Sequence, residues 1–296
     1  AVRNAPYQRK KPFGSRFTAI LAARSALVKK AARALKFIQN QRRGRPSEAK
    51  PRASGTLIKK TEGLTKMERT VKICMAGFGN VGVRFARMLL EHERSLRDEY
   101  NCRVVVTGVC TRTRGTVINP EGLGRFDSEY PGFTPNCGAP EMIERCGADI
   151  FIELSTLSVK DGEPASSYIR AALEHGMHVI TANKGPEAWR YAELKALADE
   201  HGKRYLFETA VLDGTPLFNM ARGCLPGCEV TAIRGIINTT TNFILGEIER
   251  GGTYDEAVAE AQRRQFAEAD PSMDVDGWDG AAKICALANV LMNANA

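Results

Sequence analysis

The chain has 296 residues, enough for two domains, and its 43% hydrophobic and 7% aromatic content is ordinary for a globular protein. No apolar run reaches membrane-spanning length, and the eight cysteines contain no CxxC pair that would begin a zinc site. The net charge of +8 is unevenly distributed: residues 1–66 hold 18 of the 42 Lys and Arg but only two acids, so they carry +16 and the remainder carries −8. We therefore expect reduced thiols, a cytoplasmic location and two unlike segments joined near residue 66.

Residues 1–66 are predicted to be a basic, disordered extension outside any domain, with one basic amphipathic helix around residues 17–39. Three explanations compete: a transit peptide, a nucleic-acid-binding arm, or sequence translated upstream of the true start. We favour the last, because Ala1 is not an initiator whereas Met67 opens MERTVKICMAGFGNVG. No nucleic-acid or membrane partner is expected.

The first predicted strand, VKICMA, runs directly into GFGNVG and then into an amphipathic helix. In that order the glycines allow a tight turn and a close approach of a pyrophosphate to the helix N-terminus, so the sequence predicts dinucleotide binding. The residues predicted to contact the cofactor here are Gly77, Gly79, Asn80, Val81 and Gly82.

A second strand at residues 103–110 ends in CTRTRG, where a NAD-specific site would carry an acid. Arg112 and Arg114 are suited to a 2′-phosphate, so NADP is the predicted cofactor and NAD the alternative. A solvent-exposed basic turn would explain the same residues.

Further strands are predicted at residues 150–154, 178–181 and 205–208, with a helix at 186–201. This alternation predicts an α/β fold with a Rossmann-type doubly wound parallel sheet over residues 67–210, followed by a partial α+β substrate domain over 211–296. TANKGP places Lys184 just beyond a strand's carboxyl end, where ligands bind in such sheets. GIINTTTNFIL is predicted as an apolar strand that passes into a helix; a hydroxyl-rich helix cap is an equally good explanation of its polar residues.

The stretch EADPSMDVDGWDGAAK is the most unusual in the chain. A calcium loop is excluded, because its twelfth position should be Glu and is Lys283. Lys283 is the only charge in GAAKICALANVLM, which predicts a helix buried on all sides. Asp279 and Asp276 precede it by four and seven residues, so both are expected on its face of that helix. An enclosed amine held by carboxylates is a candidate proton donor; a solvated acidic face is the alternative.

From about Met67 onward the chain resembles the homoserine dehydrogenase family, because GFGNVG, TANKGP, ETAVLDGTP, GIINTTTNFIL and AEADPSMDVDGWDGAAK occur in the family's order. The resemblance implies NAD(P)H-dependent, reversible reduction of aspartate 4-semialdehyde to homoserine, in threonine and methionine biosynthesis, and a homo-oligomer for the complete protein. It assigns Lys283 as proton donor, Asp279 as its holder and Lys184 as a second catalytic lysine. It also implies substrate contacts from Glu268, Asp274 and Thr240, and a monovalent cation, Na⁺ or K⁺, at Glu208 and the carbonyls of Val211, Asp213 and Thr215.

Three positions depart from the family pattern: Thr239 stands where Gly is usual, and Gln265 and Phe266 replace a Gly-Tyr pair. Family members also continue beyond the point where this chain stops, so we expect a fragment. The alternatives are a related NADP-dependent oxidoreductase for another small amino-acid aldehyde or alcohol, and a non-catalytic NADP-binding fragment. A phosphorylating aldehyde dehydrogenase is unsupported, because Thr239 stands where its Cys would be and no His follows His201.

Overall fold

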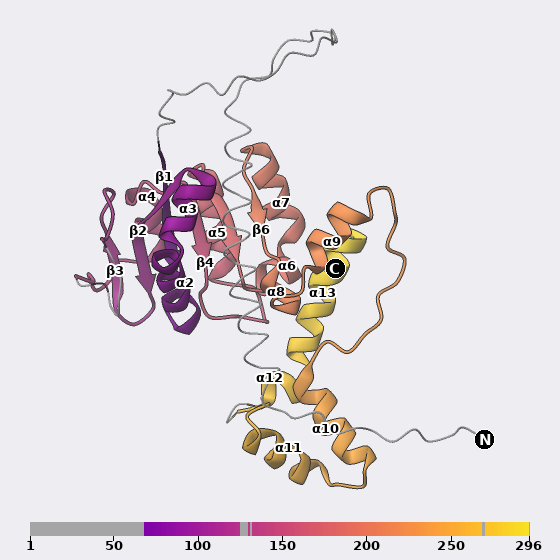
Figure 1. Ribbon diagram of the computed structural model, residues 1–296. Helices are drawn as coiled ribbons and strands as arrows, with labels where there is room; N and C mark the ends of the chain where they lie inside the picture. The colour runs from indigo at the N-terminus through magenta and orange to yellow at the C-terminus, as the bar shows by residue number, and fades with distance from the viewer. Residues whose placement is uncertain (1–67, 125–129, 131, 268–269, 296) are drawn as a thin grey trace.

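The computed structural model describes residues 68–124, 130, 132–267 and 270–295 (Figure 1). The predicted basic extension at 1–66, its helix at 17–39 and the predicted substrate residue Glu268 lie outside the described residues.

The core of the fold is a six-stranded sheet in the order β3-β2-β1-β4-β5-β6. All neighbours pair in parallel except β3, which is antiparallel to β2. The strands are β1 (Arg69–Ala76), β2 (Cys102–Thr111), β3 (Gly115–Ile118), β4 (Ile150–Glu153), β5 (His178–Thr181) and β6 (Tyr205–Leu206). The chain moves outward from β1 to β2 and then returns to β4 on the other side of β1, which creates a topological switch point at the carboxyl ends of β1 and β4. The predicted Rossmann-type fold is confirmed.

Helices cover both faces of this sheet, and alternate residues of β1 show which helix packs on which face. Val71, Ile73 and Met75 belong to one hydrophobic cluster with residues of α2 (Asn80–Glu91) and α3 (Glu93–Tyr100). Cys74 and Ala76 belong to the opposite cluster. There the helices are α4 (Ala139–Arg145), α5 (Ala165–Glu174) and α7 (Tyr191–Glu200). The strands are therefore buried on both faces, as the near-continuous apolar runs of the sequence predict.

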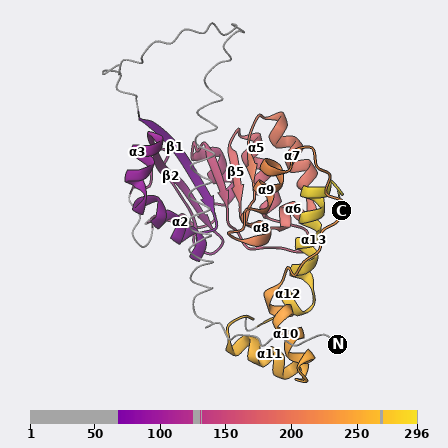
Figure 2. The same ribbon diagram turned by 45° about the vertical axis from the view of Figure 1, so that its right-hand side comes forward.

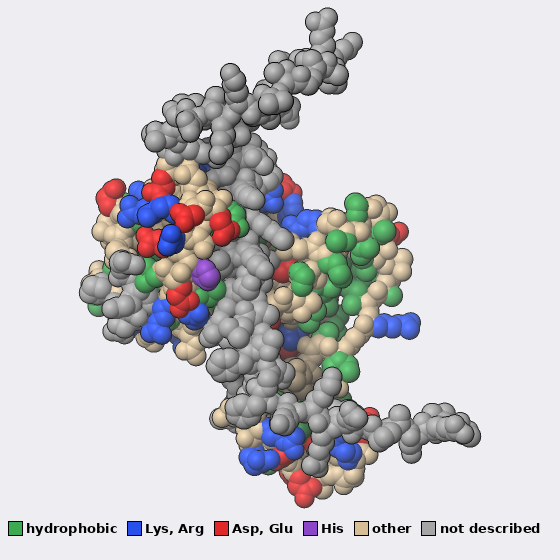
Figure 3. All heavy atoms as spheres, in the orientation of Figure 1, with side chains coloured by type: hydrophobic (Ala, Val, Ile, Leu, Met, Phe, Trp, Pro, Cys, Tyr) green, Lys and Arg blue, Asp and Glu red, His purple; other side chains and the backbone are tan. Residues whose placement is uncertain are grey.

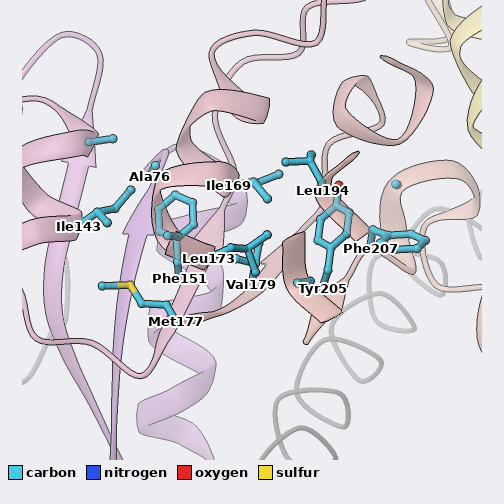
Figure 4. Close-up of a cluster of buried hydrophobic side chains, with 14 of the residues drawn as sticks. Ala76, Ile143, Phe151, Ile169, Leu173, Met177, Val179, Leu194, Tyr205 and Phe207 are labelled. Atoms are coloured by element: carbon cyan, nitrogen blue, oxygen red, sulfur yellow. The ribbon is translucent and has the colours of Figure 1, made fainter. Parts of the chain in front are cut away.

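Figure 4 shows the second cluster, in which Phe151 and Val179 from the sheet meet Ile169 and Leu173 from α5. All four side chains are fully buried. The predicted helix at 186–201 is two helices, α6 (Gly185–Trp189) and α7, separated at Arg190. The Trp189 indole, at the end of α6, donates to the Val159 carbonyl at 2.9 Å. This contact joins segments 30 residues apart, so no local sequence pattern predicts it.

Beyond the sheet the regular elements of the described chain are helices: α8 (Thr209–Leu212), α9 (Leu217–Cys224), α10 (Thr239–Glu249), α11 (Tyr254–Arg263), α12 (Ser272–Val275) and α13 (Trp278–Met292). Figures 1 and 2 both place α13 beside α6, whereas α10, α11 and α12 group together away from the sheet. The Asn289 amide ties α13 to α6 by donating to the carbonyls of Glu187 and Ala188. The predicted domain boundary at 210/211 falls within the single turn of α8, and it stays a prediction.

The predicted strand in GIINTTTNFIL is wrong. Residues 229–238 have no regular secondary structure, and Ile236 is 74% exposed. A strand requires a pairing neighbour, and none of the described strands lies beside this segment.

Hydrophobic side chains gather on the surface over α9 and α13 (Figure 3), where Met220 and Leu225 are 50% and 44% exposed. None of the described helices combines the length and hydropathy needed to cross a bilayer.

Candidate active site

The GFGNVG turn lies at the switch point, between β1 and α2. Gly77 has φ +95°, and a Cβ there would lie 2.1 Å from the Leu154 carbonyl oxygen, so only glycine fits. A Cβ on Gly82 would lie 2.7 Å from the Gly77 oxygen. At Gly79, by contrast, no heavy atom of the described residues lies within 4 Å of a built Cβ. Gly77 and Gly82 are thus closely packed, whereas Gly79 borders open space at the N-terminus of a twelve-residue helix. This arrangement fits a pyrophosphate.

A cavity of about 770 Å³ opens above this turn. Its lining includes Gly77, Gly79, Arg112 and Arg114. The Arg112–Gly115 turn after β2 is held by Thr111, whose hydroxyl accepts from the Arg114 amide at 2.9 Å. The Arg114 guanidinium lies 4.7 Å from the Phe133 ring centroid, and Arg112 is exposed. Both predicted arginines therefore lie at the cavity that the glycine turn forms, which has the size and chemistry for a dinucleotide.

Lys184 follows β5 and is the N-cap residue of α6, so it stands at the carboxyl edge of the sheet as predicted. Two side-chain hydrogen bonds shape its turn. The Thr181 hydroxyl accepts from the Asn183 amide at 2.9 Å, and the Asn183 side-chain oxygen accepts from the Gly185 amide at 3.1 Å. A smaller cavity of about 190 Å³, lined in part by Lys184, adjoins the larger one above the glycine turn, which we call the cofactor cavity, since Leu154 and Ser155 line both.

The centre of the site is Asp279, whose carboxylate binds two ammonium groups. Its Oδ1 lies 2.9 Å from Lys184 Nζ and its Oδ2 lies 2.8 Å from Lys283 Nζ. The three side chains are 12–17% exposed. Burial acts to raise the pKa of Asp279, but the hydrogen bonds from both lysines and Asn238 outweigh it and lower that pKa to about 2. One carboxylate thus holds both amines in a partly enclosed site.

Asn238, which the sequence reasoning did not single out, connects this cluster to α10. Its side-chain nitrogen donates to Asp279 Oδ2 at 2.9 Å and to Asp274 Oδ1 at 2.7 Å. Its oxygen accepts from the Thr241 amide at 2.8 Å and so caps the helix. The predicted substrate residue Asp274 is thereby brought to the lysine cluster. The sequence signal was the cap pattern Asn-Thr-Thr-Thr, which indicates a helix start but not the two carboxylates.

The predicted contact residue Thr240 is 5% exposed, and its hydroxyl donates to the Phe266 carbonyl at 2.8 Å. It holds the turn after α11, where Gln265 has φ +59°. The Phe266 ring packs against Phe243 at 5.0 Å between centroids. The departures from the family pattern are thus adjacent to a predicted substrate residue.

Two expectations about the last helix are wrong. α13 begins at Trp278, and Gly277 before it has φ +81°, so Asp276 is not on the helix that carries Lys283. The backbone leaves helical geometry at this glycine, which the simple count of seven residues ignores. The helix is also not buried on all sides, because Ile284 is 59% exposed and Trp278 is 48% exposed. Lys283 itself is on the covered side and donates to the Ile237 carbonyl at 2.8 Å.

Two of the predicted cation ligands, Glu208 and the Thr215 carbonyl, already accept hydrogen bonds from backbone amides. Glu208 is 5% exposed, and both of its carboxylate oxygens accept from the Asn219 amide, at 3.2 and 3.0 Å. The Thr215 carbonyl accepts from the Leu217 amide at 2.9 Å, so it is already engaged within its own turn. Among the described residues, no three His, Cys, Asp or Glu side chains are grouped so that they could hold a metal ion.

Comparison with protein families gives two matches. Residues 77–208 match the model "Homoserine dehydrogenase, NAD binding domain", and residues 216–296 match the model "Homoserine dehydrogenase". Together these ranges contain the glycine turn, Lys184, Asp279 and Lys283.

Individual proteins agree with the family models. The chain is 38% identical over 234 residues to the NAD(+)-dependent homoserine dehydrogenase of Pseudomonas canavaninivorans, covering 75% of this chain and 66% of that protein. It is 40% identical over 224 residues to the homoserine dehydrogenase of Sulfurisphaera tokodaii, covering 75% and 69%. The chain thus spans about two thirds of the length of these relatives, and 49% of the Lactococcus lactis homoserine dehydrogenase.

Solved structures give the same result. A putative homoserine dehydrogenase from Archaeoglobus fulgidus superposes with a TM-score of 0.64 at 30% identity, covering 76% of this chain and 69% of that one. A hyperthermophilic archaeal homoserine dehydrogenase in complex with NADPH superposes with a TM-score of 0.62 at 30% identity, covering 75% and 70%. The glycine turn, the lysine–carboxylate cluster and these matches together show that the chain belongs to the homoserine dehydrogenase family of oxidoreductases.

Proposed function

We propose that this chain catalyses the reversible NADPH-dependent reduction of aspartate 4-semialdehyde to homoserine. The single observation that carries the proposal is the pairing of Lys184 and Lys283 on Asp279, with Lys184 lining the smaller cavity that adjoins the one above the glycine turn. Bound NADPH supplies the hydride. The chain's own residues must then orient the aldehyde, stabilise the charge that develops on its oxygen and deliver a proton.

Lys283 is the proton donor. As the aldehyde carbon is reduced, negative charge develops on the carbonyl oxygen, and a fixed ammonium stabilises it where it forms. Asp279 holds Lys283 at 2.8 Å and Lys184 at 2.9 Å, so one carboxylate fixes both ammonium groups. An ammonium fixed in this way favours an anionic transition state over the neutral aldehyde.

Acidic side chains receive the α-ammonium of the substrate. Asp274, held by Asn238 at 2.7 Å, is the described candidate, and Glu268 is the second. An ammonium brought into a partly enclosed site needs such partners, because a charge without them is costly to desolvate. Thr240, whose hydroxyl donates to the Phe266 carbonyl, is a further proposed substrate contact.

The cofactor preference and the cation are finer parts of the proposal. Arg112 and Arg114 at the cavity support NADP, through forked hydrogen bonds to a 2′-phosphate. One relative is described as NAD(+)-dependent and one structure contains NADPH, so family membership alone is compatible with both cofactors. A monovalent cation at Glu208 is a separate proposal, and none of the steps above depends on it. A homo-oligomer remains a prediction from the resemblance, and a cytoplasmic location remains a prediction from the cysteine content.

The test is an assay of NADPH consumption with L-aspartate 4-semialdehyde, with homoserine identified by mass spectrometry. Succinate semialdehyde, which lacks only the amino group, is the matched control, and we expect its kcat/KM to be lower by about a hundredfold or more. Equal turnover of both aldehydes would favour the alternative of a related oxidoreductase with another substrate. Tight NADPH binding without turnover of either would support the non-catalytic fragment instead.

A further inference from the structure

A fully buried carboxylate, Glu153, lies at the carboxyl end of β4, directly before Leu154 and Ser155, which line the cofactor cavity. It accepts three hydrogen bonds. The Ser155 amide and hydroxyl donate to Oε1 at 2.7 and 2.5 Å, and the Thr181 hydroxyl donates to Oε2 at 2.7 Å. One partner is an amide and two are hydroxyls, and a carboxylate can accept a hydrogen bond from each of them.

The hydrogen bonds continue from Glu153 to the backbone on both sides of Lys184. The Thr181 hydroxyl uses its proton for Glu153 and its lone pair for the Asn183 amide, at 2.9 Å. The Asn183 side chain then accepts from the Gly185 amide at 3.1 Å. The amides immediately before and after Lys184 are therefore both held by this chain of contacts.

Packing restricts the same turn. A Cβ on Gly185 would lie 2.8 Å from the Ser158 carbonyl oxygen and 2.9 Å from the Gly162 Cα, so the backbone is in close contact with the β4–α5 connection. The Lys184 side chain must reach Asp279 from this fixed point, and its Nζ lies 2.9 Å from Oδ1. A small change in the backbone position of residues 183–185 would consequently move one of the two amines at the reaction centre.

We infer that Glu153 is a positioning residue that, through the Thr181 hydroxyl, fixes the turn carrying Lys184 and thereby aligns this amine with Asp279. The inference rests on the proposed function. It predicts that breaking the Thr181 contact lowers turnover without weakening cofactor binding, because Thr181 does not line the cofactor cavity. A loss of about tenfold to a hundredfold in kcat is the scale for misplacing a catalytic group by a fraction of an ångström to one ångström.

Thr181→Val tests this, since it keeps the shape of the side chain and removes the hydroxyl. Thr107→Val is the matched control: Thr107 is equally buried in β2, and its hydroxyl donates to the Ile73 carbonyl at 3.3 Å, away from Lys184. We expect kcat to fall in the first variant and to stay within about twofold in the second, with an unchanged Kd for NADPH in both. Thr181→Ser, which restores the hydroxyl, should regain most of the turnover.

The decisive measurement is the same substitution in a Lys184→Ala background. A positioning role predicts that Thr181→Val has almost no further effect on kcat there, because the amine that it aligns is gone. An equal loss in both backgrounds, or an equal loss in Thr107→Val, would overturn the inference.

Amide hydrogen exchange supplies a readout that does not depend on turnover. Exchange at Asn183 and Gly185 should become faster in Thr181→Val and in Glu153→Gln, but not in Thr107→Val. If the wild-type chain bound NADPH but reduced no aldehyde, the proposed function would fail, but the exchange measurement would still show whether Glu153 holds the turn. Unchanged exchange at both amides would refute the positioning role even in an active enzyme.

Discussion

Glu187 on α6 gives a sharp prediction of how stability depends on pH. Its side chain is fully buried; Oε1 accepts from the Tyr205 hydroxyl at 2.5 Å, and Oε2 has no hydrogen-bond partner among the described residues. Burial raises the pKa of Glu187 from the ordinary 4.5 to about 8; the Tyr205 hydrogen bond opposes this and the nearby charge of Glu153 adds to it. Between these two pH values the folded chain retains a proton that the unfolded chain releases, so stability falls as pH rises through this window.

Glu187→Gln removes this titration and keeps an acceptor for Tyr205. A difference of about 3.5 pKa units at about 1.4 kcal/mol each makes the variant more stable than wild type by about 5 kcal/mol above pH 8, and by about 3 kcal/mol near pH 7. Below about pH 4.5 the two should have similar stability. Urea denaturation at one-unit steps from about pH 5 to about pH 9 measures this, with Glu200→Gln, exposed at the end of α7, as control. Parallel stability curves for Glu187→Gln and wild type would refute the reasoning.

Two further predictions concern a helix end and the cofactor cavity. Gln265 follows α11 at φ +59°, and the next amide, of Phe266, donates to the Ala261 carbonyl, as in a helix C-cap that favours glycine. Gln265→Gly should therefore raise the free energy of unfolding, measured in urea, by about 0.5–1 kcal/mol. No gain in stability would contradict the assigned helix cap. Arg112→Ala combined with Arg114→Ala should raise the Kd for NADPH by about tenfold or more and leave that for NADH within about twofold; an equal effect on both cofactors would mean that the arginines do not contact the 2′-phosphate.

Much of the sheet could be predicted from the sequence, because parallel strands buried on both faces appear as short, near-continuous apolar runs. The strand predicted at residues 178–181 is observed with those bounds, and the one at 150–154 extends only one residue too far. The antiparallel edge strand β3 was not predicted. It has four residues and begins with Gly115, so it carries no periodic signal.

The site was predictable where its contacts are local. The Lys283–Asp279 ion pair joins residues four apart on one helix, and it is observed. The bond from Lys184 to the same carboxylate joins residues 95 positions apart, so it depends on α13 packing against α6. The roles of Glu153 and Asn238 were missed for the same reason, since each connects separate segments through side-chain hydrogen bonds that leave no periodic pattern.

Lys283→Ala tests the central claim, that this lysine donates the proton, most directly. Asp279 would keep Lys184 and Asn238 as partners, so the substitution strands no buried charge, and the thermal midpoint should stay close to wild type. Turnover of aspartate 4-semialdehyde should fall by about a hundredfold to ten-thousandfold, while the Kd for NADPH stays within about twofold. Ile284→Ala, at the exposed neighbouring position of α13, should leave turnover intact. Near-normal turnover in Lys283→Ala would contradict the account.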